Sequence, residues 1–174
     1  MNILVTGSNG QVGSEIRELS SDYSYNFFFT DRNNIDITCK DSIKDFCQAN
    51  NINVIVNCAA YTAVDKAETD IENADLGNRK AVKKLSIVSK DLDIKLIHIS
   101  TDYVFDGKNF KPYCEEFQTN PQGVYGKTKL DGENEMRDIN PKNSIIIRTS
   151  WVYSSFGNNF VKTMLRLGKE KEEL

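Results

Sequence analysis

The sequence predicts an α/β fold, a doubly wound parallel sheet of the Rossmann type, and three observations support this prediction. Short apolar, β-branched runs recur along the chain, they alternate with segments of helical periodicity, and three spaced glycines directly follow the first run. The runs are almost continuously apolar, which is typical of parallel strands covered by helices on both faces. The five expected strands are residues 2–6, 26–30, 52–57, 94–100 and 143–149.

Helical patterns lie between these runs, which favours right-handed crossovers and a parallel sheet. Helices are expected to begin near Gln11 and near Asp41, where the sequence TCKD resembles a capping box. A longer helix is expected roughly from Asp70 to Lys90, and an amphipathic one over residues 158–170. The longer helix carries four apolar side chains on a helical period: Ala74, Ala81, Leu85 and Val88.

The composition is that of one ordinary globular domain spanning residues 1–174. A net charge of −3 provides no basic field, so neither nucleic acid nor an anionic membrane is expected as a partner. No apolar run approaches the roughly 20 residues that span a bilayer, and the N-terminus lacks the features of a signal peptide. A cytoplasmic protein is therefore predicted. The four cysteines are scattered and His98 is the only histidine, which predicts reduced thiols rather than a metal site or a disulfide framework.

Gly7, Gly10 and Gly13 form the pattern G-x-x-G-x-x-G between the first expected strand and the first expected helix. Such glycines permit a tight turn, a close approach of backbone to a pyrophosphate, and close packing of helix on strand. The free N–H groups at the start of the helix would hold the phosphates. A glycine triplet alone is weak evidence, but its position between strand and helix predicts a dinucleotide-binding loop.

An acidic residue for the adenosine ribose is expected at the end of the next strand, and Asp31 meets this requirement. Arg32 follows it, and an arginine can pair with a 2′-phosphate, although an ordinary surface residue is the alternative. NAD and NADP therefore both remain open.

Small residues follow the third expected strand, where Ala59 and Ala60 would let the backbone pass close to a cofactor. The other interpretation is a strand-to-helix turn in which Thr62 caps a helix and Asp65 and Glu68 favour its N-terminal end. Both can hold together.

Ser100, Thr101 and Asp102 end the fourth expected strand, at the same sheet edge as the glycine loop. A hydroxyl there can hydrogen-bond a substrate carbonyl, although a simple turn is the other interpretation. Tyr125 and Lys129 share a face if residues 124–136 are helical. A nearby ammonium would lower the pKa of the tyrosine, so the pair is predicted to donate a proton to a carbonyl as hydride arrives.

This ordered set resembles the extended short-chain dehydrogenase/reductase superfamily. Within it, the stretches NILVTGSNGQVGSE, VIVNCAAYTAVDKAE, STDYVFDG, VYGKTKLDGE and RTSWVYSSFGNNFVKTMLRL are similar to the dTDP-4-dehydrorhamnose reductase family. The resemblance implies that Tyr125 is the proton donor, Lys129 its partner and ribose anchor, and Thr101 the group that polarises the ketone. It implies a set of substrate-facing residues: Asp102, Tyr103 and Trp151, the last with a core tryptophan as the alternative. It also implies a set of cofactor-lining residues: Gly10, Gln11, Val12, Asp31, Asp36, Ile37, Ala60, Tyr61 and Thr62.

That family reduces the C4 ketone of dTDP-4-dehydro-L-rhamnose to dTDP-L-rhamnose, a precursor of cell-wall polysaccharide, with NADPH or NADH. The resemblance implies a further C-terminal region, on the order of 100 residues, that supplies most of the nucleotide-sugar pocket and that residues 1–174 lack. A homodimer is left open. So is Mg²⁺, for which Glu15 is the one candidate here, without support from other residues of the chain.

Two other functions remain open. A non-catalytic NAD(P)-binding subunit that regulates a partner would not need an intact Tyr125–Lys129 pair or Trp151. A sugar-nucleotide epimerase or dehydratase uses the same scaffold, but STDYVF lacks the glutamate expected of a dehydratase and offers only Asp102.

Overall fold

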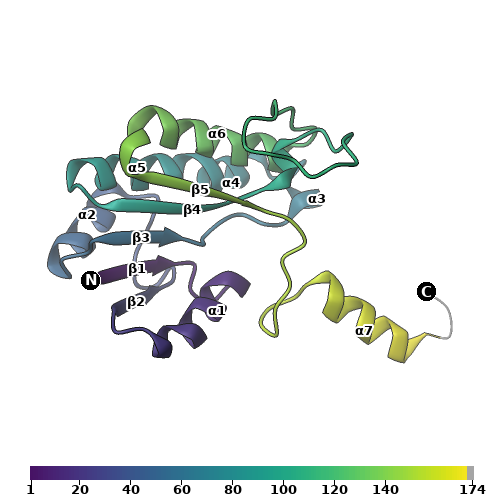
Figure 1. Ribbon diagram of the computed structural model, residues 1–174, viewed down its shortest axis with the longest axis horizontal. Helices are drawn as coiled ribbons and strands as arrows, with labels where there is room; N and C mark the ends of the chain where they lie inside the picture. Colours follow the sequence, from purple (N-terminus) through teal and green to yellow (C-terminus); the bar gives the residue numbers. More distant parts are fainter. Residues whose placement is uncertain (172–174) are drawn as a thin grey trace.

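The computed structural model describes residues 1–171 and contains a five-stranded parallel sheet in the order β2-β1-β3-β4-β5 (Figure 1). Its strands are β1 Asn2–Thr6, β2 Asn26–Thr30, β3 Val54–Asn57, β4 Lys95–Thr101 and β5 Ser144–Thr149. The strand order reverses at β1, which pairs with β2 on one side and with β3 on the other. The expected doubly wound, Rossmann-type sheet is therefore confirmed.

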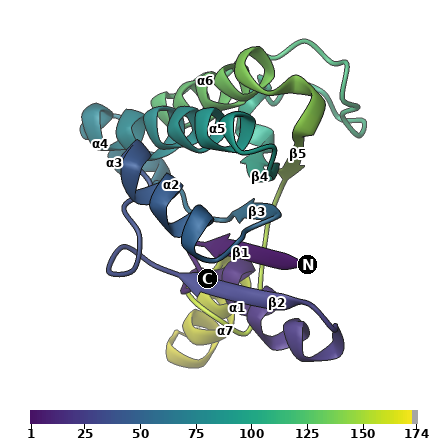
Figure 2. The same cartoon turned by 90° about the vertical axis from the view of Figure 1, so that its left-hand side faces the viewer.

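Three helices cover one face of this sheet, as Figure 2 shows: α2 Lys40–Ala49, α5 Ala81–Asp91 and α6 Val124–Ile139. On the opposite face α1, Gln11–Leu19, packs against β1 and β2 through Ile16. The last helix, α7, Phe160–Glu170, lies away from the sheet beyond the carboxyl ends of the strands (Figure 1). The helices expected near Gln11 and over 158–170 are thus present.

The main core lies between the sheet and the three helices that cover it. Leu4, Ile55 and Leu96 come from three neighbouring strands, and Leu85 and Met136 come from α5 and α6; all five side chains are fully buried. Burying an aliphatic side chain of this size contributes about 1.5–3 kcal/mol. This layer therefore holds the strands and α6 in a fixed relation, on which the geometry of the site depends.

The second face of the sheet is only partly covered, which contradicts the expectation of strands covered on both faces. Ile145 and Ile147 on β5 are 56% and 43% exposed, and an apolar groove along this face is lined by Ile3, Val56 and Ile97 among others. The cause lies in the connections. Right-handed crossovers that move toward β5 all place their helices on one face, and the connection from β1 to β2 moves the other way.

The long helix expected from Asp70 to Lys90 is interrupted. It consists of α4, Ile71–Asp75, a wider π-helical turn over Leu76–Lys80, and α5. The four apolar side chains of the expected stripe are all fully buried: Ala74, Ala81, Leu85 and Val88. The periodicity therefore identified the buried face correctly but gave no sign of the π-helical turn.

Two expected helix caps do not form. Cys39 precedes α2, and the Thr38 hydroxyl donates instead to Oδ1 of Asp36 at 2.6 Å. The short helix α3, Val64–Ala67, begins after Ala63 without a capping side chain, so Thr62 does not cap it.

No helix in residues 1–171 is both long enough and apolar enough to cross a bilayer. All four cysteines are free thiols.

Candidate active site

One large cleft lies at the carboxyl ends of the strands, with a volume of about 1810 Å³. Ligand pockets commonly measure about 300–1,000 Å³, so the cleft has room for an extended dinucleotide together with a second ligand. The sequence-predicted site residues that line it are Gly7, Gly10, Gln11, Val12, Asp31, Arg32, Asp36, Ile37, Ala60, Tyr61, Thr62, Thr101, Asp102, Tyr103, Tyr125, Lys129 and Trp151. Gly13 alone among the predicted residues is not part of the lining.

The glycine loop has the close contacts that its sequence predicts. Gly7 has a φ of +65°, and a Cβ there would lie 2.6 Å from the backbone nitrogen of Ala59. A Cβ on Gly13 would lie 2.6 Å from the carbonyl oxygen of Gly7, so this glycine allows α1 to pack against the loop. Gly10 precedes α1, and no side chain caps the helix. The first N–H groups of α1 are therefore available to an anion, as a pyrophosphate requires.

The end of β2 presents a carboxylate to the cleft. Asn9, which sequence reasoning did not single out, donates through Nδ2 to Oδ2 of Asp31 at 2.9 Å, and the N–H of Asn33 donates to Oδ1 at 2.8 Å. These bonds fix the carboxylate at the cleft edge, where a ribose hydroxyl can donate to it. Arg32 beside it is exposed. In the same loop, hydrogen bonds from the Thr38 hydroxyl and N–H lower the pKa of Asp36.

The segment after β3 is held by a buried side chain that was missed from the sequence. Asn78, in the π-helical turn, accepts from the N–H of Tyr61 at 2.9 Å and donates to the carbonyl of Tyr61 at 3.1 Å. It also donates to the Thr128 hydroxyl on α6 at 3.2 Å, so it links the cofactor side of the cleft to the helix that carries Tyr125. The available signal was a polar residue on the apolar stripe between Ala74 and Ala81.

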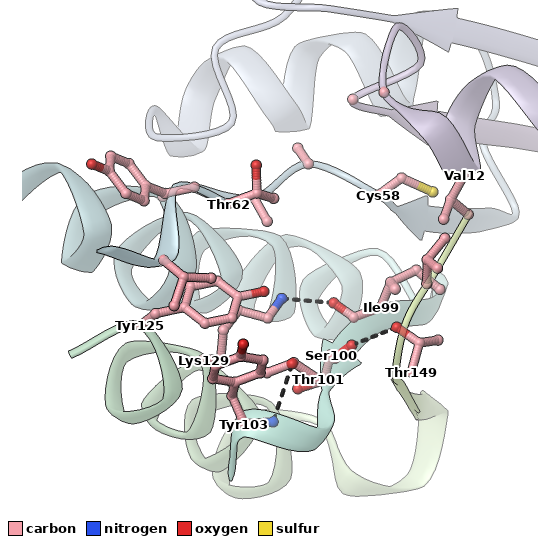
Figure 3. A pocket seen from close by; sticks show the side chains of 18 of the residues that line it. Val12, Cys58, Thr62, Ile99, Ser100, Thr101, Tyr103, Tyr125, Lys129 and Thr149 are labelled. Carbon is pink, nitrogen blue, oxygen red and sulfur yellow. Dashed lines mark hydrogen bonds between the residues drawn. The ribbon is translucent and has the colours of Figure 1, made fainter. Parts of the chain in front are cut away.

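Three side chains meet at the opposite side of the cleft: Thr101 from the end of β4, and Tyr125 and Lys129 from α6 (Figure 3). The Thr101 oxygen accepts from the N–H of Tyr103 at 3.2 Å. The amine of Lys129 is buried and donates to the carbonyl of Ile99 at 2.7 Å. The Thr101 hydroxyl donates to Oδ1 of Asp102 at 3.2 Å. Because the hydroxyls of Thr101 and Tyr125 and the amine of Lys129 line the same cleft, they can serve a carbonyl oxygen that binds there.

The expectation that Lys129 lowers the pKa of Tyr125 is wrong for this structure, because the pKa of Tyr125 is raised. Burial is the main cause; the Thr101 hydroxyl acts in the opposite direction, and Asp102 and Tyr103 raise the pKa further. The pKa of Lys129 itself is lowered by burial to about 8. Tyr125 therefore keeps its proton at neutral pH, as a proton donor must.

Aromatic side chains line the outer part of the cleft. Tyr103 packs edge-on against Tyr125, with ring centroids 5.6 Å apart. Trp151 is 74% exposed, packs edge-on against Phe160 and has a φ of +54°. A non-glycine residue in the left-handed region is strained, and such strain clusters at functional sites. Trp151 is therefore not a core tryptophan. In the same cleft lining, Asp102 accepts a hydrogen bond from the hydroxyl of Ser150 at 2.6 Å.

The glycine loop, the free helix N-terminus and the carboxylate of Asp31 together fit a dinucleotide cofactor. The described residues do not provide a comparable set of ligands for a metal ion. In residues 1–171 no three histidine, cysteine or acidic side chains gather closely enough to hold an ion.

Three similar proteins carry the same name. The chain is 43% identical over 174 residues to a dTDP-4-dehydrorhamnose reductase of Sinorhizobium fredii, with all of this chain and 58% of that protein covered. A crystal structure of a dTDP-4-dehydrorhamnose reductase from Clostridium acetobutylicum superposes with a TM-score of 0.95 at 44% identity, covering 100% of this chain and 61% of that one. A structure of a dTDP-4-dehydrorhamnose reductase from Bacillus anthracis in complex with NADP superposes with a TM-score of 0.95 at 38% identity. The match covers 99% of this chain and 61% of that one.

The chain therefore spans about three fifths of the length of these relatives. The family model described as the RmlD substrate binding domain matches residues 1–174, the whole of the sequence. The protein belongs to this family.

Proposed function

We propose that the protein reduces the C4 ketone of dTDP-4-dehydro-L-rhamnose to dTDP-L-rhamnose with NADPH or NADH, and that residues 1–174 are its cofactor-binding and catalytic part. The observation that carries the proposal is the convergence of Thr101, Tyr125 and Lys129 on the cleft that also contains the glycine loop. The names of the relatives support the reaction and the substrate. The nucleotide and sugar would be bound jointly with a region outside this chain.

In this proposal the reduced nicotinamide supplies a hydride to C4 when it is bound. Thr101 and Tyr125 receive the ketone oxygen, and the phenol gives it a proton as negative charge develops there. Lys129 holds the nicotinamide ribose and supports the resulting phenolate. The exposed aromatic side chains of Tyr103 and Trp151 offer flat apolar surface to a sugar ring.

The cofactor side of the cleft has a matching division of roles. The N–H groups after Gly10 bind the pyrophosphate, Asp31 binds the adenosine ribose, and the loops at Asp36–Ile37 and Ala60–Thr62 enclose the adenine and the ribose of the nicotinamide. Arg32 is the residue we expect to favour NADPH, because its guanidinium can pair with a 2′-phosphate. The Bacillus anthracis relative was solved with NADP, which supports this assignment.

A titration of residues 1–174 with NADPH, followed through the nicotinamide fluorescence, tests the proposal. We expect saturable binding. Absence of binding at millimolar cofactor would overturn the proposed function for this chain. A parallel titration of the variant Arg32→Ala separates the two cofactors: NADPH affinity should fall by about tenfold, the loss of one exposed charge-assisted contact, and NADH affinity should stay the same. Equal changes for both cofactors would contradict the role of Arg32.

A further inference from the structure

His98 is a buried titratable group that the proposed reaction does not use. It lies on β4 on the face covered by α6, and its side chain is fully buried. Strand register places it beside Asn57 on β3, which in turn lies beside Thr6 on β1. The three side chains form a polar row across the sheet, and the row ends at Lys129 on α6.

The hydrogen bonds of Asn57 fix the orientation of its amide. Its Oδ1 accepts from the N–H of Ala59 at 3.2 Å and from the hydroxyl of Thr6 at 2.7 Å. Because a backbone N–H can only donate, the amide oxygen must face Ala59 and the amide nitrogen must face the other way. That nitrogen lies 2.9 Å from Nδ1 of His98. An amide nitrogen also only donates, so Nδ1 is the acceptor.

The proton of the neutral imidazole is therefore on Nε2. The ring is neutral because burial and the charge of Lys129 hold the pKa of His98 well below its usual value, against a smaller opposite effect of the Asn57 backbone. Nε2 lies 3.3 Å from Nζ of Lys129. An ammonium has three donors and no acceptor, and Ile99 accepts one of them. His98 thus presents an N–H where the ammonium needs an acceptor.

We propose that His98, oriented by Asn57, is a positioning residue that favours the neutral form of the Lys129 amine. Its importance for catalysis rests on the proposed function, because Lys129 would hold the cofactor ribose beside Tyr125. The other titratable groups near the amine are Cys58 after β3 and Glu133 on α6. Tyr125 on α6 lines the same cleft. Burial lowers the pKa of Lys129, and the carboxylate of Glu133 acts in the opposite direction. The Cys58 thiol is neutral where Lys129 titrates, because burial raises its own pKa to about 12.

This arrangement makes the charge of Lys129 depend on what occupies the cleft. A ribose hydroxyl of a bound cofactor can accept a hydrogen bond from Nζ, whereas Nε2 of His98 cannot. A bound cofactor therefore favours the ammonium form of Lys129. Cofactor binding should therefore raise the pKa of the Lys129 amine above the value of about 8 that burial gives it.

The tautomer can be measured directly, because His98 is the only histidine in the sequence. With ¹⁵N-labelled histidine, NMR of residues 1–174 reports each ring nitrogen without further assignment. We expect a neutral ring with the proton on Nε2, unchanged through the pH range in which free histidine titrates, around 6.5. A proton on Nδ1, or a ring that becomes charged in this range, would overturn the proposal.

The effect on Lys129 needs a variant. With ¹³Cε-labelled lysine, and Lys129→Met to identify the resonance, the Lys129 pKa should rise by about 0.5 or more in His98→Leu, which removes the opposing N–H. The control Leu96→Met alters the same face of β4 without touching the amine, and should leave this pKa in place. An unchanged Lys129 pKa in His98→Leu would mean that His98 does not contribute to it, and a lower one would mean that Nε2 accepts a hydrogen bond from the amine; both contradict the proposal.

These measurements are made without cofactor or substrate, so they are separate from the proposed function. If NADPH fails to bind while His98 carries its proton on Nε2 and the Lys129 pKa responds to His98→Leu, the function is wrong and the inference stands. If NADPH binds and the proton is on Nδ1, the inference is wrong and the function stands. The ring measurement uses the unaltered sequence, so it decides the question even if His98→Leu does not fold.

Discussion

The guanidinium of Arg148 on β5 donates to both carboxylate oxygens of Glu133 on α6, at 3.0 Å to Oε1 and 2.6 Å to Oε2. The same carboxylate accepts from the hydroxyl of Ser100 at 2.6 Å and from Arg137 at 2.9 Å. Glu133 is fully buried. One carboxylate therefore connects the ends of β4 and β5 to the helix that carries Tyr125.

Replacing Glu133 by glutamine should strongly destabilise the fold. The variant leaves the partly buried cation of Arg148 without a counter-charge, and breaking a buried pair on one side costs about 3–5 kcal/mol. Urea denaturation should show this loss in the free energy of unfolding. The matched control is Glu135→Gln on the same helix, whose ion pairs with Arg79 and Lys83 are more exposed and should contribute about 0–1 kcal/mol.

The same variant should alter the response to acid. Hydrogen bonds and charges from Arg148, Ser100 and Arg137 outweigh burial and lower the pKa of Glu133 below its usual 4.5. A lowered pKa contributes stability that is present above the usual value and is lost as the pH falls through the folded-state pKa. Below pH 4.5 the unaltered protein should therefore lose stability more steeply than Glu133→Gln. Equal slopes would show that the carboxylate is not paired in solution.

Lys129→Met should stabilise the folded chain at neutral pH. The pKa of Lys129 falls from 10.5 to about 8 in the folded state, so at pH 7 the buried charge costs on the order of 3 kcal/mol. Between pH 8 and 10.5 the unfolded chain binds more protons than the folded one, so the stability of the unaltered protein rises with pH. The advantage of the variant should be complete below pH 8 and vanish by about pH 10.5, as urea denaturation across this range would reveal. A variant that is less stable at pH 7 contradicts the prediction.

Tyr125→Phe should remove the proposed proton donor without disturbing the fold. In the full-length enzyme we expect kcat for the 4-keto sugar to fall by about 10²–10⁴-fold, the usual contribution of a general acid. Because the ring still packs against Tyr103, the affinity for NADPH and the free energy of unfolding should stay close to those of the unaltered enzyme. Near-normal turnover would remove Tyr125 from the mechanism.

We expect the partly uncovered apolar face of the sheet to promote self-association of residues 1–174, and Ile145→Lys should reduce it. The side chain lies on the open apolar face of the sheet and is already 56% exposed, so the change should cost little stability. Sedimentation velocity should show a smaller fraction of oligomers, and a dye that binds apolar surface should show weaker fluorescence. Leu165→Lys on α7 is a control at an aliphatic side chain of similar exposure, 62%. An equal decrease in the control would show that general charge, and not this face, is responsible.

Local patterns predicted the parts of this protein that depend on neighbouring residues in the sequence. The strand ends of β1 and β2 agree with their apolar runs, and the glycine loop has the conformation that its spacing requires. The position of Tyr125 and Lys129 on one helix follows from their separation by four residues. All of these features depend on backbone geometry within a few residues.

Most of the parts that were wrong or missed depend on residues far apart in the sequence, and the cap of α2 is the exception. Thr38 had a competing acceptor in Asp36, so the expected cap of α2 did not form. The apolar run of β5 would be the same whether helices cover one face of the sheet or both faces, so the sequence did not show that one face is open. The raised pKa of Tyr125 comes from burial, and the link from Asn78 to Tyr61 crosses 17 residues. Apart from the hydrogen bond between Thr38 and Asp36, none of these causes is visible in a short window of sequence.

The central position of β1 in the sheet has a consequence for synthesis. All strand pairing that fixes the glycine loop lies within the first 57 residues, since β1 pairs with β2 and β3, whereas Tyr125 depends on α6 and on its tie to β5. Chains emerge from the ribosome N-terminus first, at about 5–20 residues per second. A nascent chain therefore completes the strands that hold its glycine loop several seconds before α6 and β5, which position Tyr125, have been synthesised.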